Sequence, residues 1–438
     1  MIIEIKIANY RSINEEQTIS FAAEDAPRLA GNLIPCKGFK LMKAAALFGA
    51  NASGKSNLVK AIAMIVKFIR ISATGMNSGD LIQAAEPYKL TEHTRNNPSR
   101  FELVFLLNAQ LYRYGFSVRS DRVYEEWLEA ENPGAKKLNF GFKRSYNSRD
   151  DHYIWEFHGS LKSVGDILKE RTRINALALS TGSRENISQL QEIYLYFKNQ
   201  IWIQSMSNGA DGLKSQTAKR CGEYPIMFDK VTNLLRDADT GIDRFRIEHK
   251  KMDEIESIDE NAPPKVQEFQ RAINKLFEST IQQKIIVSRT AENGEEIEFD
   301  FDSEESTGTL RLFALAGPIL DSMEKGAFIV VDELDSSMHP LLSRKLLELF
   351  QSQENNTQGA QLLFTTHDPS LLDQELFRRD QIWIAEKQNG ATAFYSLLDI
   401  EPKPRNTESF LRNYMAGRYG GTPNFGRSFD TPAMLVEI

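Results

Sequence analysis

Residues 49–56, Gly-Ala-Asn-Ala-Ser-Gly-Lys-Ser, have the types and spacing that hold a phosphate chain, because they match the pattern G-x-x-x-x-G-K-[ST]. The two glycines let the backbone turn tightly, so that its N–H groups point at phosphate oxygens. Lys55 is placed to reach the β and γ phosphates, and the Ser56 hydroxyl to ligate Mg²⁺. The predicted nucleotide-binding residues of this segment are Gly49, Asn51, Ser53, Gly54, Lys55, Ser56 and Asn57.

Two adjacent carboxylates follow a run of four apolar residues at 328–331. Such a run predicts a strand buried on both faces of a parallel sheet. Asp332 at its carboxyl end is placed to hold Mg²⁺, and Glu333 is the better candidate for polarising an attacking water. Unpaired carboxylates at the edge of a core are costly, and Mg-ATP would supply their partner.

A histidine follows a second apolar strand, in the segment Thr365-Thr366-His367-Asp368. One helix, expected at about 341–351, separates the two strands, so both strand ends are expected at the same sheet edge. His367 would there reach a γ-phosphate. A lone histidine is more often a structural residue, and that alternative stays open. The catalytic candidates are Lys55, Glu333 and His367.

Small residues at 305–309, Glu-Ser-Thr-Gly-Thr, precede an expected helix at 310–323. Such a cluster is both a helix N-cap and an anion site. Taken alone, the segment is best interpreted as an ordinary cap.

The phosphate loop lies between an expected strand at 43–48 and an expected helix at 57–69. This context disfavours the alternative of a chance Gly/Ser loop. Residues 2–7 alternate like a strand, with 17–21 as its hairpin partner, and short runs between 101 and 142 predict an antiparallel meander.

The middle of the chain, from about 161 to 280, has a mostly helical pattern, clearest at 186–200 and 264–278. Residues 297–301 then alternate, which predicts a half-buried strand with an acidic outer face. Further on, Asn389-Gly390 is a strong hairpin signal.

Composition is that of a globular protein: 438 residues, 41% of them hydrophobic and 26% charged. We expect no membrane span and no signal peptide, and two distant cysteines fit a reduced cytoplasmic compartment. The net charge of −7 argues against a globally basic nucleic-acid coat, although a local basic groove stays open.

With these residues in view, the chain resembles an ABC-type ATPase head of the SMC/RecF/OLD group. Within it the chain is most similar to the RloA or AbiL-type ATPases (AAA family) of bacterial phage-defence and abortive-infection operons. Asn9-Tyr10-Arg11-Ser12 resembles the N-[FY]-[KR]-S segment of SMC-like heads, and residues 306–309 the reduced S-x-G-T signature. Residues 332–340 match the E-[LIF]-D-x-S-[LM]-H-P run, and residues 414–420 resemble an L-x-G-R-Y-G ending.

The resemblance implies a head-to-head dimer that sandwiches two ATP molecules with Mg²⁺. Lys55, Ser56, Asp332, Glu333 and His367 of one subunit would face Ser306 and Gly308 of the other across the nucleotide. Arg11 and Ser12 would lie near the nucleotide, Glu333 would be the general base, and Asp335 would lie at the dimer interface. Ser56 and Asp332 would hold the metal. The glutamine of the usual Q-loop has only one weak candidate, Gln83.

The expected fold class is α/β: an ABC-type P-loop NTPase head, with a mixed sheet and an antiparallel β-lobe, and an inserted, mainly helical lobe or arm. The expected segments are 1–90 (β-lobe and P-loop), 91–160 (antiparallel region), 161–295 (inserted lobe), 296–400 (signature, Walker B, D-loop and H-loop) and 401–438 (extension).

Three functions fit such a head. The first is a phage-defence ATPase, triggered by a phage protein, that regulates a separate effector such as a Toprim/RloB-like nuclease encoded nearby. The second is a DNA-binding ATPase of the RecF/SMC kind in DNA repair or maintenance. The third, an OLD-type enzyme with its own nuclease domain, is disfavoured because no Asp-x-Asp follows His367. Asp300-Phe301-Asp302 has that pattern but is better read as structural.

Direct DNA binding would need a basic surface. The candidates are Lys136-Lys137, Lys143-Arg144, Arg171-Thr172-Arg173 and His249-Lys250-Lys251. Most such clusters are solvated surface, and residues 292–305 are strongly acidic. The sequence therefore disfavours direct DNA binding, and that alternative stays open.

Overall fold

The computed structural model divides the chain into two compact units. It describes residues 1–83, 85–131, 138–204, 210–251, 263, 266–267, 281–405 and 407–423. The first unit contains residues 1–205, 322–335 and 346–438, and the second contains residues 206–321 and 336–345.

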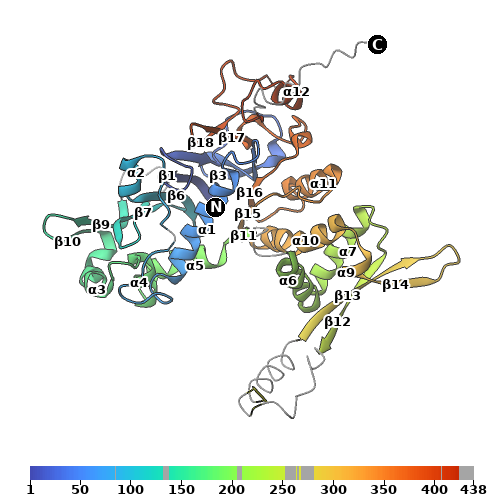
Figure 1. The fold of residues 1–438 in the computed structure, drawn as a ribbon, viewed down its shortest axis with the longest axis horizontal. Coiled ribbons are helices and arrows are strands. Elements are labelled where there is room, and N and C mark those ends of the chain that lie inside the picture. Colours follow the sequence, from blue (N-terminus) through green and yellow to red (C-terminus); the bar gives the residue numbers. More distant parts are fainter. Residues whose placement is uncertain are drawn as a thin grey trace. The chain divides into compact units, whose positions relative to one another are not determined.

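A six-stranded sheet with the order β11-β15-β16-β5-β17-β18 forms the centre of the first unit (Figure 1). Its strands are β5 (Ala44–Phe48), β11 (Ile201–Gln204), β15 (Phe328–Val331), β16 (Gln361–Thr365), β17 (Ile382–Gln388) and β18 (Ala391–Ser396). All neighbours are parallel except β17 and β18. Strands β5, β15 and β16 are fully buried, which confirms the expected parallel strand at 328–331. The carboxyl ends of β5, β15, β16 and β17 therefore share one sheet edge.

Helix α1 (Lys55–Ile71) begins directly after the phosphate loop. It buries the stripe Leu58, Ile62, Ile65 and Ile69 at three- and four-residue spacing, as predicted. Each of these side chains contributes about 1.5–3 kcal/mol by leaving water. This packing fixes the helix start against the carboxyl end of β5.

A seven-stranded antiparallel sheet has the order β10-β9-β8-β7-β6-β1-β2. Its strands are β1 (Ile2–Ala8), β2 (Gln17–Ser20), β6 (Ser99–Leu107), β7 (Gln110–Val118), β8 (Val123–Glu131), β9 (Leu138–Asn147) and β10 (His152–His158). The β1–β2 hairpin and the meander are both confirmed.

Helices α3 (Gly165–Arg171), α4 (Ala178–Arg184) and α5 (Ser188–Asn199) belong to the same unit as this sheet. Phe105 of β6 lies against Tyr196 and Phe197 of α5. The carboxylate of Glu126 on β8 accepts hydrogen bonds from the first two N–H groups of α4. These contacts explain why residues 161–204 belong to the first compact unit, whereas the segment expected from the sequence groups them with the rest of 161–295. The assignment of functions to the five expected segments remains a prediction.

The second unit combines helices with a small sheet. It contains α6 (Ala210–Glu223), α7 (Pro225–Asp237), the antiparallel strands β12 (Arg244–Lys251), β13 (Ile281–Thr290) and β14 (Glu296–Asp300), α9 (Phe301–Glu304) and most of α10 (Thr307–Lys325). The mostly helical pattern expected at 161–280 is therefore interrupted by β11 and β12. Phe245 and Ile247 alternate with charged residues in β12, a period of two that favours a strand. Apart from residues 266 and 267, which are helical, the helix expected at 264–278 lies outside the described residues.

The strand expected at 297–301 is wrong in two details. Ile297 is 43% exposed, because β14 is an edge strand with only β13 beside it. Phe301 is not in the strand but in α9, where its buried ring packs against Phe313. The side chain of Asp300 caps α9 by accepting from two backbone N–H groups, which is a structural role.

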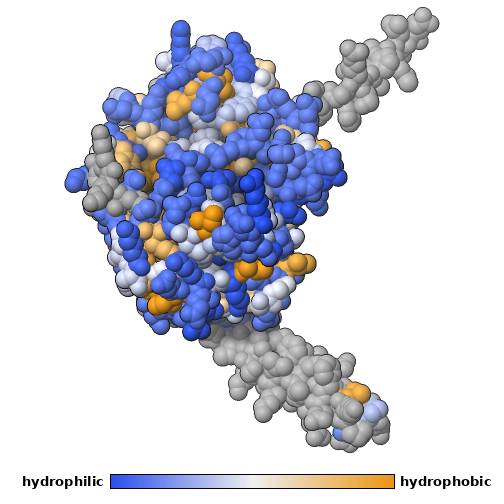
Figure 2. Space-filling view, turned by 90° about the vertical axis from the view of Figure 1, so that its left-hand side faces the viewer, coloured by the Kyte–Doolittle hydropathy of each residue, from blue (hydrophilic) through white to orange (hydrophobic). Residues whose placement is uncertain are grey.

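The remaining elements are α2 (Glu92–Asn96), β3 (Leu33–Cys36), β4 (Phe39–Met42), α11 (Pro340–Gln351) and α12 (Phe410–Met415). Within the described parts of the chain, no helix is long and apolar enough to cross a membrane. One face of the molecule is mostly hydrophilic with small, separate apolar patches (Figure 2), a pattern that is ordinary for a protein surface.

Candidate functional site

The backbone of the phosphate loop has positive φ angles at positions where glycine is favoured. Gly49 and Gly54 have φ angles of 149° and 110°, and Ala52 has a φ of 61°. A Cβ atom at Gly49 would collide with the carbonyl oxygen of Ala385, and one at Gly54 would collide with the Thr392 side chain. The loop is therefore wedged against the β17–β18 hairpin, and its glycines are required by both torsion and space.

The start of α1 is open to an anion. No side chain caps this helix at Gly54, and the buried Ser53 hydroxyl has no hydrogen-bond partner in the described chain. A buried polar group without a partner is rare and calls for an explanation. Free N–H groups at a helix start and an unpaired hydroxyl are what a phosphate group would satisfy.

Lys55 lies buried inside the loop, with 4% of its surface exposed. Its ammonium donates hydrogen bonds to the carbonyl oxygens of Gly49 (2.6 Å) and Ala50 (3.0 Å), and it lies 3.4 Å from Nδ1 of His367. Burial lowers the pKa of Lys55 to about 8, although the nearby carboxylates of Glu333, Asp332 and Asp335 act in the opposite direction. A bound polyanion would favour the charged form.

Ser56 and Asp332 lie together as the metal prediction requires. The Ser56 hydroxyl is 3.4 Å from Oδ1 of Asp332, and the same oxygen accepts a hydrogen bond from the Thr365 hydroxyl at 2.6 Å. A hydroxyl and a carboxylate fit Mg²⁺, which is usually held by one or two protein oxygens together with phosphates and water. No cluster of three acidic, histidine or cysteine ligands occurs among the described residues, so any Mg²⁺ here would depend on the nucleotide for its other ligands.

Glu333 presents its carboxylate to the same hollow. Its backbone is in the left-handed region, with a φ of 53°, a strained conformation that its neighbours must hold. The Thr365 hydroxyl accepts from the Glu333 N–H at 2.7 Å, and Oε1 of Glu333 lies 3.8 Å from Nε2 of His367. The His367 N–H donates to the Asp335 carboxylate. Sequence reasoning missed Thr365, whose place between two carboxylates is visible only when β15 and β16 are paired.

These groups surround one hollow of about 510 Å³ within the first unit. It is lined by residues 51–57, Glu333, His367 and Lys387. The volume is typical of a small-molecule site. Lys387 was not predicted, although its place just before the Asn389-Gly390 hairpin signal could have suggested a residue at the sheet edge.

Arg11 and Ser12 are not among the residues that line the hollow, and their side chains bind neighbouring residues instead. Ser12 Oγ lies 2.7 Å from Thr392 Oγ1 and accepts from the Asn57 side chain at 2.7 Å. Arg11, with a φ of 52°, forms an ion pair with Glu86 at 2.6 Å. A nucleotide role for Arg11 and Ser12 remains a prediction.

The signature segment lies in the second unit, at the start of α10. Ser306 Oγ accepts from the Thr309 N–H at 3.1 Å, so it acts as the helix cap considered in the sequence analysis. A Cβ atom at Gly308 would lie 2.8 Å from the Ser337 carbonyl oxygen, which explains the glycine. Contact of Ser306 and Gly308 with a nucleotide remains a prediction.

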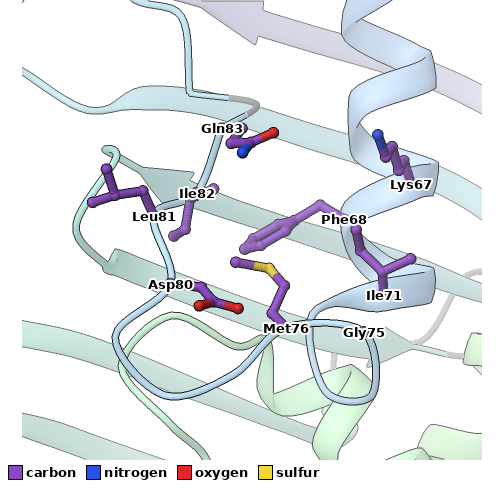
Figure 3. A pocket seen from close by; sticks show the side chains of 9 residues that line it. All are labelled: Lys67, Phe68, Ile71, Gly75, Met76, Asp80, Leu81, Ile82 and Gln83. Carbon is purple, nitrogen blue, oxygen red and sulfur yellow. The ribbon is translucent and has the colours of Figure 1, made fainter.

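Gln83 lines a different hollow, of about 560 Å³, beside the second half of α1 (Figure 3). Phe68, Met76 and Ile82 form its apolar wall, and Gln83 and Lys67 lie on opposite sides of it (Figure 3). This hollow is slightly larger than the one beside the phosphate loop, but it contains none of the residues with phosphate chemistry. Gln83 is thus not among the residues that surround the phosphate loop.

A strand–loop–helix phosphate site, with a carboxylate at the end of a strand one position removed from the loop strand in the same sheet, is typical of the class of P-loop ATPases. Residues 44–373 match the family described as "AAA domain, putative AbiEii toxin, Type IV TA system". The chain therefore belongs to this family, and the α/β fold expected of a P-loop NTPase is confirmed. Comparison with curated proteins gives no match.

Two solved structures are similar over most of their length. One is the SMC head domain from Thermotoga maritima, with a TM-score of 0.41 and 14% identity, covering 90% of this chain and 98% of that chain. The other is the recombination mediator protein RecF-ATP in the RecFOR pathway, with a TM-score of 0.29 and 16% identity, covering 90% and 99%. Both scores are low, so neither likeness bears on the function of this chain.

Proposed function

We propose that this protein binds Mg-ATP in the hollow beside the phosphate loop and hydrolyses it in a head-to-head homodimer. The observation that carries the proposal is that Lys55, Ser56, Glu333 and His367 line one hollow, with Asp332 lying 3.4 Å from the Ser56 hydroxyl and Glu333 lying 3.8 Å from His367. Each of these groups has a separate task in phosphoryl transfer to water.

In the proposed reaction, the backbone of the loop and Lys55 bind the β and γ phosphates. Ser56 and Asp332 would hold Mg²⁺, which would neutralise charge on the phosphate oxygens. Glu333 accepts a proton from the attacking water while the water oxygen forms a bond to the γ phosphorus. The bond between the γ phosphorus and the β–γ bridging oxygen breaks, and ADP leaves. His367 donates to the γ-phosphate.

The second half of the proposed site comes from another copy of the chain. Ser306 and Gly308 of the partner subunit would cap the γ-phosphate, and Asp335 would lie at the interface. A two-fold dimer makes two such sites, since each head supplies one loop and one signature.

The biological role we propose is regulation of a separate toxic effector in anti-phage defence, in the manner of the RloA or AbiL-type ATPases. The family description, which names a putative toxin of a type IV toxin–antitoxin system, supports a defence setting. The effector would be a Toprim/RloB-like nuclease encoded nearby, and the trigger a phage protein, all in the cytoplasm.

The side chains of two basic clusters count against the alternative of a RecF-like DNA-binding role. Arg144 is fully buried in an ion pair with Glu126, and Arg173 donates to the carbonyl oxygens of Ser72, Ala73 and Met76. Lys143 is exposed, and it lines a hollow together with two arginines and four glutamates: Arg100, Arg113, Glu102, Glu125, Glu129 and Glu156. The side chains of Arg144 and Arg173 are therefore engaged within the protein, so they offer little to a phosphate backbone. Residues 136 and 137 lie outside the described chain, as do the side chains of 249–251.

Replacing Glu333 with glutamine tests the ATPase proposal. We expect turnover to fall by about 10²-fold or more, because glutamine cannot accept the proton from water. ATP should then accumulate in a stable dimer, measured by size-exclusion chromatography with light scattering. Glu354→Gln, at an exposed glutamate outside the hollow, is the matched control. Undiminished turnover in Glu333→Gln would remove Glu333 as the base.

The defence role has its own test. Cells that carry the chain with the product of the neighbouring reading frame should resist phage, and Lys55→Ala should abolish the resistance. Salt-dependent DNA affinity of the purified protein, without any complex with that product, would support the RecF-like role instead.

A further inference from the structure

The β17–β18 hairpin forms a wall of the hollow that neither the sequence motifs nor the proposed mechanism uses. Strand β17 runs parallel to β5, with Ile384 paired to Phe48, so its carboxyl end reaches the same sheet edge as the phosphate loop. Lys387 is the next-to-last residue of β17. The hairpin then turns at Asn389 and Gly390, whose φ angles are 50° and 83°.

Thr392 holds the loop in place. Its hydroxyl donates to the Ser53 carbonyl oxygen at 2.8 Å and lies 2.7 Å from Ser12 Oγ, and its N–H donates to the Ser12 carbonyl oxygen at 2.7 Å. The Thr392 side chain is also the group that leaves no room for a Cβ atom at Gly54. One buried side chain therefore joins the hairpin, the loop and the turn at Ser12.

The strand register gives the direction of Lys387. Lys387 is the cross-strand partner of Thr392, and cross-strand partners project on the same face of a hairpin. Because the Thr392 side chain contacts the loop, the Lys387 side chain lies over the loop as well, where it lines the hollow. Glu386, which projects on the other face, accepts hydrogen bonds from the side chains of Gln388 and Tyr395 instead.

Within the described parts of the chain, the charge of Lys387 is not balanced by an ion pair. Among the described residues no carboxylate forms an ion pair with Lys387, and the one carboxylate that lines this hollow is Glu333. Lysine is a point charge suited to phosphate oxygens, and a triphosphate carries more negative charge than Lys55 and one Mg²⁺ neutralise.

We propose that Lys387 is a second phosphate-binding cation of the nucleotide site and that Thr392 is the positioning residue that holds the phosphate loop for it. This inference rests on the proposed ATP site and extends it: the ligand class is a polyphosphate, recognised from the hairpin side as well as from the loop.

Binding measurements with two ligands test the role of Lys387. ATP and inorganic tripolyphosphate, each with Mg²⁺, would be titrated by calorimetry into the full chain. We expect Lys387→Ala to weaken both ligands by about tenfold, and Lys387→Arg to keep the affinity within about threefold, because only the charge is needed. Lys37→Ala, at an exposed lysine outside the hollow, should change nothing.

The outcomes separate this inference from the ATPase proposal. If the wild type and Lys55→Ala bind ATP equally, the ATP site itself is wrong. If Lys55→Ala loses binding while Lys387→Ala binds like the wild type, only the role of Lys387 is overturned. Loss of ATP affinity with unchanged tripolyphosphate affinity would also overturn it, because the contact would then be to the base or ribose.

Thr392 is tested by a pair of near-isosteric variants. Thr392→Val removes the hydroxyl and should weaken ATP several-fold at a temperature where the variant is fully folded by circular dichroism. Thr392→Ser keeps the hydroxyl and should restore the affinity. A merely structural role predicts a lower unfolding temperature in Thr392→Val with unchanged ATP affinity in the folded protein, and that result would overturn the positioning role.

Discussion

The chain begins two of its helices with small residues, and the two starts differ in what satisfies them. At α1 the residue before the helix is Gly54, no side chain caps the helix, and the Ser53 hydroxyl has no hydrogen-bond partner in the described chain. At α10 the Ser306 hydroxyl accepts from the Thr309 N–H and so caps the helix itself. The first start is prepared for an anion, whereas the second is complete without one.

This difference teaches that similar composition does not make similar sites. We expect the α1 start to bind phosphate as it stands. The α10 start would meet a γ-phosphate only by sharing or giving up the Ser306 cap, so we expect it to act late, when two heads close on a nucleotide.

The largest expected effect is the loss of ATP binding in Lys55→Ala. The ammonium is the buried cation of the loop, so its removal should weaken ATP by about 10²-fold or more, measured by calorimetry or filter binding. Ser306→Ala should leave the affinity of the monomer for ATP unchanged. Equal losses in the two variants would contradict the distinction between the two helix starts.

A second effect should appear when two inactive variants are mixed. Lys55→Ala destroys the loop site, and Ser306→Arg blocks the signature with a bulky side chain. A mixed dimer keeps one intact pair, so equimolar mixing should restore about a quarter of the wild-type turnover. Each variant alone, measured at the same total concentration, is the control. Absence of rescue at every ratio would count against a site shared between two subunits.

The sequence predicted the first helix start better than the second for a physical reason. The elements around the loop are local: a buried strand, two glycines and an apolar helix stripe follow one another in residues 44–71, and the structure has each of them. Thr365, Thr392 and Lys387 could not be found in this way. Thr392 and Lys387 reach the loop only because β17 pairs with β5, more than 300 residues away, and a hydrogen bond such as that from Thr392 to Ser53 leaves no local pattern. Thr365 meets Asp332 and Glu333 only because β15 pairs with β16.

The errors have the same origin. The alternation at 297–301 predicts a half-buried strand, but how much a strand is covered depends on what lies beside it, and β14 has only one neighbouring strand. Arg144 was read as basic surface, whereas pairing of β8 with β9 places it opposite Glu126 in the core. The charge of Arg144 therefore suggests an exposed residue, whereas in the fold this arginine forms an ion pair inside the core.

A pH dependence should also distinguish the two starts. Burial lowers the pKa of Lys55 to about 8 in the free protein, and bound phosphates would raise it. ATP binding must then take up a proton above pH 8, so the affinity should be level below that pH and fall towards tenfold per pH unit above it. Calorimetry in buffers of different ionisation enthalpy measures the proton uptake directly.

Lys55→Arg is the control for this titration, because arginine stays charged throughout the range. Any affinity that it retains should be independent of pH between 7 and 10. A parallel fall in the wild type and Lys55→Arg would assign the pH dependence to another group.

The smallest expected effect concerns stability without any nucleotide. Ser306→Ala removes a helix cap and should lower the free energy of unfolding by about 1 kcal/mol. Ser53→Ala removes a hydroxyl that has no partner in the described chain, so it should leave the stability unchanged or raise it slightly. Urea titrations followed by circular dichroism would show the loss of stability in Ser306→Ala. The affinity for ATP should respond in the opposite order, falling in Ser53→Ala but not in Ser306→Ala. If Ser53→Ala were the more destabilised variant, the start of α1 would be complete in the free protein, and the distinction between an open and a self-capped helix start would fail.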